Sequence, residues 1–200
     1  KPENQLYFAR EGFTCVALSW IIMSMVGAVP FVINGDIPNF IDAFFEATSG
    51  FTTTGASILK DVEALSKCSM MWRSFTHWIG GMGVFVFILA VLPMAGGYSM
   101  HLMRAESPGP TVGKLLPKIR ETAKILYIIY FAMTVLQFVI LLILSMPFFD
   151  ALTITFGTAG TGGFGIKNNS IAGYSIPIQI TITVFMILFG VNFNAYYLLL

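Results

Sequence analysis

Long apolar stretches alternate with short polar ones along this chain of 200 residues. Four of the apolar stretches approach the roughly 20 residues that a helix needs to span a bilayer. They cover residues 13–33, 72–97, 125–149 and 176–200. The second and fourth are less uniformly apolar, because the second contains Arg73 and His77 and the fourth contains Asn192 and Asn194. The pattern predicts four transmembrane helices.

Each pair of predicted helices has one shorter apolar segment between its members. These segments cover residues 38–50 in the first pair and 147–158 in the second. A helix of about 12 residues is only about 18 Å long. Such a helix can enter a bilayer but cannot cross it. We therefore expect two half-helices that enter the membrane and turn back.

The two halves of the chain repeat each other, which is a pattern worth seeking before any other. With a shift of 108 positions, Asp42 falls on Asp150, Thr53 on Thr161 and Gly55 on Gly163. The predicted fold class is an all-α polytopic membrane protein built from tandem helix–pore-loop–helix repeats. The predicted parts are a cytoplasmic N-terminal segment (1–12), a first unit (13–97), a cytoplasmic connector (98–124) and a second unit (125–200).

Composition and charge agree with a membrane protein. Hydrophobic residues make up 56% of the chain and charged residues only 10%, against about 25% charged residues in soluble domains. The net charge of +1 is uninformative about nucleic acid, but the chain lacks the basic run that a nucleic-acid binder shows, so no nucleic-acid partner is expected. The Lys/Arg excess of the connector predicts that it is cytoplasmic, so both half-helices would enter from the outer face. Because the chain lacks an initial Met and ends in an apolar run, we expect a longer polypeptide.

The polar loops TTTGAS (52–57) and GTGGFG (160–165) follow the half-helices. Irregular backbone is tolerated at membrane depth where it is buried in protein or lines a water-filled cavity, and the C-terminal end of a half-helix favours a cation. Rings of loop carbonyls can replace the hydration shell of potassium. The predicted ion-binding residues are Thr53, Thr54, Gly55, Ala56, Thr161, Gly162, Gly163 and Phe164. Two loops would supply half of a ring, and the alternative is that they are extramembrane turns.

Charged residues near the loops are candidate supports for the filter. We expect Glu46 to hold the first loop by accepting hydrogen bonds from backbone amides, because a charge at membrane depth requires a partner. Asp42 and Asp150 occupy the first turns of the half-helices, where the helix dipole stabilises a carboxylate. Arg73 is expected to reach the interface or an outer acidic residue, and His77 to be a packed interfacial residue. No transition-metal site is expected.

Several motifs together resemble those of a known family. They are DAFFEATSGFTTTGAS, WRSFTHWIGGMGVFVF, LPMAGG, RAESPGP, ETAKILYIIY and TAGTGGFGIKNNS. In this order and over nearly the whole chain, they resemble the Trk/Ktr/HKT superfamily of potassium transporters, and within it the bacterial Trk-type potassium-uptake membrane subunits. The chain resembles the first two of the four units found in that superfamily.

The resemblance implies potassium uptake, with K⁺ as the transported ion and no organic cofactor. It places the filter glycines at Gly55 and Gly163, and it implies that glycine rather than serine at Gly55 favours potassium over sodium. It further implies a multi-pass protein of the cell inner membrane, a homodimer, and a cytoplasmic nucleotide-binding regulatory subunit as partner.

Other functions stay open from the residues. The same scaffold could carry a sodium-conducting or poorly selective cation pathway. A membrane enzyme or a scaffold subunit are more distant alternatives. A membrane protease would need a Ser/His, paired Asp or HExxH arrangement, and neither His77 nor His101 has such a setting. We therefore expect no enzyme. Asn192 and Asn194 could bridge helices or line an inner cavity.

Overall fold

The computed structural model describes residues 9–83, 119–193 and 195–196. These residues form helices and loops, and no strand occurs among them, so the predicted all-α class is confirmed. The helices are α1 (Ala9–Asn34), α2 (Phe40–Phe51), α3 (Lys67–Gly81), α6 (Ile119–Ile143), α7 (Phe148–Ala159) and α8 (Ile176–Gly190). Most of the predicted N-terminal segment and connector, together with His101 and Asn194, lie outside the described residues.

Two of the described helices contain a stretch long and apolar enough to cross a membrane, Val16–Asn34 in α1 and Lys124–Ile143 in α6. Helices α3 and α8 have 15 residues each and end at Gly81 and Gly190. Residues 84–97 of the predicted span 72–97 and residues 194 and 197–200 of the predicted span 176–200 lie outside the described residues. The third predicted span ends early, at Ile143 instead of Phe149. The physical reason is that Ser145 adopts a left-handed backbone, with φ 65°, and the following Pro147 disfavours helical geometry before it.

The half-helices α2 and α7 have 12 residues each and start close to the predicted positions. Asn39 caps α2, because its side chain accepts a hydrogen bond from the amide of Ile41. Both half-helices are preceded by a sharp turn after the first helix of their unit. In the first unit this turn is made by Gly35, whose φ of 77° suits glycine at a helix end.

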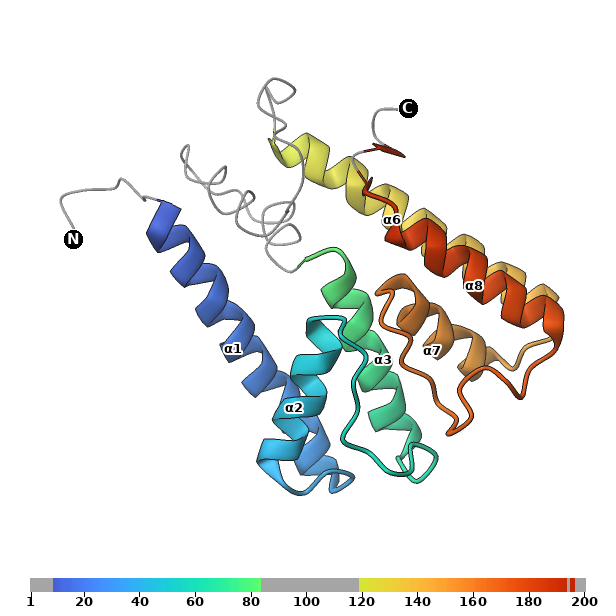
Figure 1. The fold of residues 1–200 in the computed structure, drawn as a ribbon, viewed down its shortest axis with the longest axis horizontal. Coiled ribbons are helices and arrows are strands. Elements are labelled where there is room, and N and C mark those ends of the chain that lie inside the picture. The colour runs from blue at the N-terminus through green and yellow to red at the C-terminus, as the bar shows by residue number, and fades with distance from the viewer. Residues whose placement is uncertain (1–8, 84–118, 194, 197–200) are drawn as a thin grey trace.

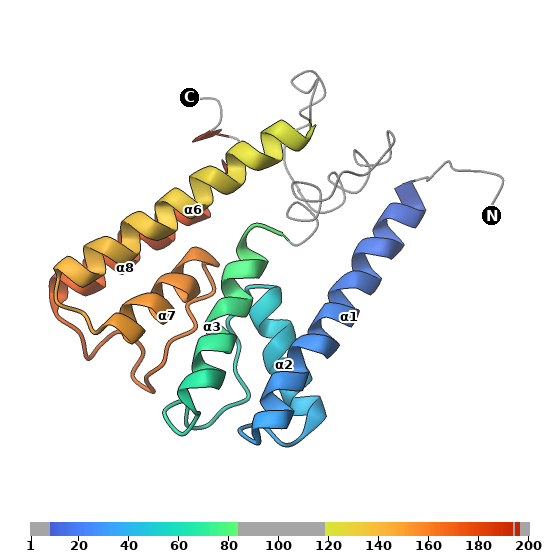
Figure 2. The same ribbon diagram turned by 180° about the vertical axis from the view of Figure 1, so that it is seen from behind.

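The two units lie side by side, with α3 at the centre between α2 and α7 (Figures 1 and 2). Each half-helix packs on the first helix of its own unit, α2 on α1 and α7 on α6. Helices α1 and α6 turn many large apolar side chains outward, including Ile22, Val26 and Ile128. An extended apolar surface of this kind marks contact with lipid or with another protein.

Candidate ion-binding site

The two polar loops have the same backbone conformation. Thr53 and Thr161 have φ of 55° and 59°, and Gly55 and Gly163 both have φ of 77°. A left-handed backbone is rare for a β-branched residue and costs about 1–3 kcal/mol. The glycines adopt it without a steric penalty. Each loop thus carries two left-handed residues separated by one other, at matching positions.

The loop amides are used to close the half-helices. Thr53 donates to the carbonyl of Gly50 at 3.0 Å, and Thr161 donates to that of Thr158 at 2.8 Å. A further amide of each loop, Thr54 in the first and Gly163 in the second, donates to a carbonyl near the helix end. The loops therefore begin directly at the negative end of each helix dipole.

The loop carbonyls, in contrast, are left without protein donors. Within the described residues, none of the carbonyls of residues 53–56 or 161–164 accepts a hydrogen bond from the protein. The loops are only partly covered: Thr53, Gly55 and Gly162 are half-buried, and Thr54, Ala56, Thr161 and Gly163 are exposed, while Phe164 is buried. Carbonyls that have no protein donor and are not fully covered can bind water or a cation.

The fold brings the two loops together. A Cβ atom added to Gly55 would collide with the carbonyl oxygen of Gly162, and one added to Gly162 would lie 2.7 Å from the carbonyl oxygen of Thr53. The matching glycine of the second loop has more room among the described residues, because such an atom at Gly163 would lie 3.7 Å from Met186 Cε and within 4 Å of no other described neighbour. Carbonyl oxygens of both predicted segments therefore meet at one place in the structure.

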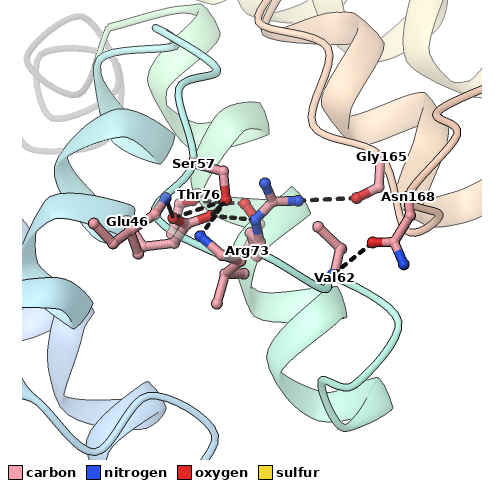
Figure 3. A network of polar contacts seen from close by, with 9 residues as sticks. Glu46, Ser57, Val62, Arg73, Thr76, Gly165 and Asn168 are labelled. Atoms are coloured by element: carbon pink, nitrogen blue, oxygen red, sulfur yellow. Dashed lines mark hydrogen bonds and ion pairs between the residues drawn. The ribbon is translucent and has the colours of Figure 1, made fainter.

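Glu46 is fully buried and has several donors around it. Its carboxylate accepts hydrogen bonds from the hydroxyl of Ser57 and from the amide of Ile58, at 3.0 Å each for the shorter contacts. It also pairs with Arg73 Nε at 2.5 Å. Figure 3 shows this network between α2, α3 and the segment that follows the first loop. Glu46 is thus in contact with the last residue of the first loop and with the residue that follows it.

The two aspartates at the starts of the half-helices differ in their surroundings. Asp42 is half-buried in the first turn of α2. Asp150 accepts a hydrogen bond from the hydroxyl of Tyr174 at 2.8 Å. Burial and this hydrogen bond raise the pKa of Tyr174 above its usual value of 10.0, so the phenol is protonated at neutral pH. Within the described residues, no three His, Cys, Asp or Glu side chains form a group that could hold a metal ion.

The expectation of an acidic partner for Arg73 is confirmed, but its expected place outside the protein is wrong. Arg73 is 4% exposed, and the carboxylate of Glu46 compensates its charge inside the protein. Its Nη1 donates to the carbonyl of Gly165 at 2.9 Å, and its guanidinium lies 3.5 Å from the ring centre of Phe164. His77 is fully buried, in agreement with the expected packed residue. A charge at membrane depth requires a partner. Two opposite charges in apolar surroundings, Glu46 and Arg73, were therefore a sequence signal from which their pairing could have been predicted.

Asn168 was not singled out from the sequence, yet it joins the segments that follow the polar loops of the two units. Its Oδ1 accepts from the amide of Val62 at 2.8 Å, and its Nδ2 donates to Asp61 at 2.7 Å. Its own amide donates to the carboxylate of Glu63 at 3.0 Å. Figure 3 shows the contact with Val62. An exposed asparagine in a loop carries no local signal of a contact more than 100 positions away.

Comparison with known proteins places this arrangement in a family. Residues 2–200 match the family model for TrkH, described as a cation transport protein. The chain is 40% identical to the Trk system potassium uptake protein TrkH of Salmonella typhimurium and to that of Escherichia coli, over 96% of this chain. It is 34% identical to the Trk system potassium uptake protein TrkG of Escherichia coli.

A solved structure agrees with these relatives. The crystal structure of the potassium transporter TrkH from Vibrio parahaemolyticus matches with a TM-score of 0.76 and 33% identity, and the match covers 98% of this chain and 39% of that one. The chain spans about 40% of the length of the TrkH relatives from Salmonella and Escherichia coli. On the family model, the sequence identities and the shared fold, this chain belongs to the TrkH family of cation transport proteins, whose members are membrane proteins.

Proposed function

We propose that this protein takes up potassium across the cell membrane, and that the two loops supply part of its selectivity filter. The observation that carries the proposal is the set of loop carbonyls without protein donors, brought together at the negative ends of two half-helices. Carbonyls in such a position replace the water molecules around a monovalent cation. The helix ends add a field that favours a cation and disfavours an anion.

The proposed ion ligands are the backbone carbonyls of residues 53–56 and 161–164. The close approach of Gly55 to the Gly162 carbonyl supports a shared site, because two loops that contact each other can face one ion. Glu46 is proposed as a support of the first loop, through its bonds to Ser57 and Ile58. Asp42 and Asp150 are proposed as supports at the helix starts. Transport then involves no covalent chemistry, and the ion gradient and membrane potential supply the driving force.

The setting follows from the family. The relatives are named as potassium uptake proteins of the Trk system, which favours potassium as the cargo. We further propose a multi-pass arrangement in the inner membrane, a second copy of the chain, and a cytoplasmic nucleotide-binding subunit as partners. The remaining ring positions would come from further pore loops.

The test is uptake by the full-length protein. It would be expressed in a bacterial strain that lacks its own potassium uptake systems, and growth on limiting potassium would be measured. Purified protein in liposomes would then be assayed for potassium and sodium flux. Potassium flux well above sodium flux would support the proposal. Equal fluxes would favour a poorly selective cation pathway, sodium flux in excess would favour a sodium-conducting one, and no cation flux would overturn the function.

A further inference from the structure

The side chain of Phe164 points out of the second loop and into the first unit. It is 3% exposed. Its ring centre lies 3.9 Å from that of His77 and 3.5 Å from the guanidinium carbon of Arg73. Arg73 and His77 are one turn apart on α3 and therefore lie on one face of that helix. The ring is thus held between two side chains of the other unit.

The backbone of the second loop lies along the same helix. A Cβ atom at Gly160 would meet the carbonyl oxygen of His77, and one at Gly162 would collide with His77 Nε2. Arg73 donates to the carbonyl of Gly165. The loop is therefore in contact with α3 from its first residue to its last.

Helix α8, the second helix of the loop's own unit, lies against the second loop less closely than α3 does. Ser66 and Ser175 are the N-caps of α3 and α8, and counting from them places Met186 at the position of His77. A Cβ atom added to Gly163 would lie 3.7 Å from Met186 Cε, an ordinary van der Waals distance. The helix that backs the second loop most closely therefore belongs to the first unit.

We propose that Arg73 and His77 are positioning residues for the second filter loop, so that the potassium preference of that loop is set by helix α3 of the preceding unit. The proposal rests on the proposed function. Arg73 is oriented by Glu46, which also holds the first loop. One buried ion pair thus connects the supports of both filter segments (Figure 3).

His77 acts in this proposal through its ring. Within the described residues, neither Nδ1 nor Nε2 of His77 has a hydrogen-bond partner. Replacement by phenylalanine therefore removes no bond to the protein and keeps an aromatic ring at this position. Replacement by alanine removes the ring and leaves Phe164 without one of its two contacts.

The experiment compares variants of the full-length protein in liposomes, with the ratio of potassium to sodium flux as the readout and thermal unfolding as a check on folding. His77→Ala should lower the ratio by about tenfold to a hundredfold, the scale on which small misplacements of a site matter. His77→Phe should keep the ratio near that of the unchanged protein. Met186→Ala is the matched variant from α8 and should change the ratio less than His77→Ala.

The outcomes separate this inference from the function. Absence of potassium flux in the protein without substitutions would refute the proposed function. A selective unchanged protein whose ratio survives His77→Ala, or falls more with Met186→Ala, would refute only the role of α3. A His77→Phe variant as poor as His77→Ala would refute the ring contact. If His77→Ala does not accumulate, Phe164→Leu removes the other ring of the same contact. This variant should lower the flux ratio, and an unchanged ratio would overturn the inference.

Discussion

The first unit joins its half-helix to its second helix with a buried ion pair, whereas the second unit uses an apolar contact at the matching positions. The shift of 108 positions places Ile154 where the first unit has Glu46, and the N-cap alignment places Ile182 where it has Arg73. Ile154 and Ile182 belong to one buried cluster. The two units therefore share a backbone arrangement but fill the matching positions with different side chains, an ion pair in the first unit and two isoleucines in the second.

The difference shows what the ion pair contributes. A buried ion pair is often no more stable than a well-packed apolar pair, and the second unit is an example of the apolar solution. The charged version has additional polar contacts, since Glu46 accepts from Ser57 and Ile58, and Arg73 donates to Gly165. We infer that the pair organises the two loops more than it stabilises the fold.

The largest effect is expected from breaking the pair on one side. Glu46→Ile leaves the guanidinium of Arg73 buried without its carboxylate, which costs about 3–5 kcal/mol. Thermal unfolding of the purified protein should show a large loss of stability. Ile154→Val at the matching position of the second unit should cost only about 0.5–1.5 kcal/mol. Similar losses in the two variants would contradict the comparison.

The next effect concerns the filter glycines. Gly55→Ser forces a side chain against the carbonyl of Gly162 and onto a left-handed backbone, whereas Gly163→Ser meets only the backbone penalty and Met186. We expect Gly55→Ser to lower the potassium-to-sodium flux ratio more than Gly163→Ser does. An equal loss would show that backbone conformation, and not the contact between the loops, decides the effect.

A double variant gives the first unit the apolar pair that the second unit has at the matching positions. Glu46→Ile with Arg73→Ile should recover much of the stability that Glu46→Ile loses, because no unpaired charge is left. The flux ratio should nevertheless fall, since the bonds to Ile58 and Gly165 are lost. Thermal unfolding and ion flux would be measured on the same preparation. Full recovery of selectivity would mean that the ion pair has no role in the filter.

A smaller effect is expected at the contact that Asn168 makes between the two units. Asn168→Ala removes the side-chain bonds to Val62 and Asp61, and an ordinary hydrogen bond contributes about 0.5–1.5 kcal/mol. We expect a modest loss of thermal stability and a small change in the flux ratio. Asn169→Ala, at the neighbouring exposed position, is the control. A loss as large as that of Glu46→Ile would place the main link between the units here.

The smallest effect concerns Asp36, which joins α1 to the start of α3. Burial alone would raise the pKa of Asp36, but hydrogen bonds from Ser66 and Asn34 lower it below its usual value of 3.8. The stability from these bonds is therefore present above that value and is lost as the pH falls through the lower folded-state pKa. The difference in unfolding temperature between the unchanged protein and Asp36→Asn should shrink between about pH 5 and about pH 2. A difference independent of pH would show that ionised Asp36 does not contribute to the stability.

Much of the local structure could be predicted from the sequence because it depends on neighbouring residues. The apolar lengths predicted α1 and α6, and the repeated shift predicted two half-helices followed by glycine loops. The end of α6 was predicted wrongly, since the predicted span continued past Pro147 and the left-handed turn at Ser145 was not anticipated. The burial of Arg73 was not predicted for a different reason: its acidic partner, Glu46, lies on another helix.

Hydrophobic pattern, internal repetition and loop composition by themselves determined an all-α membrane fold with two matching loops, because each is a property of short segments. Only the tertiary structure decided which helix supports which loop. The contacts of Phe164 with His77, of Arg73 with Gly165 and of Asn168 with Val62 join residues far apart in the chain. The packing of α3 between the two half-helices brings them together, and no local pattern encodes that placement.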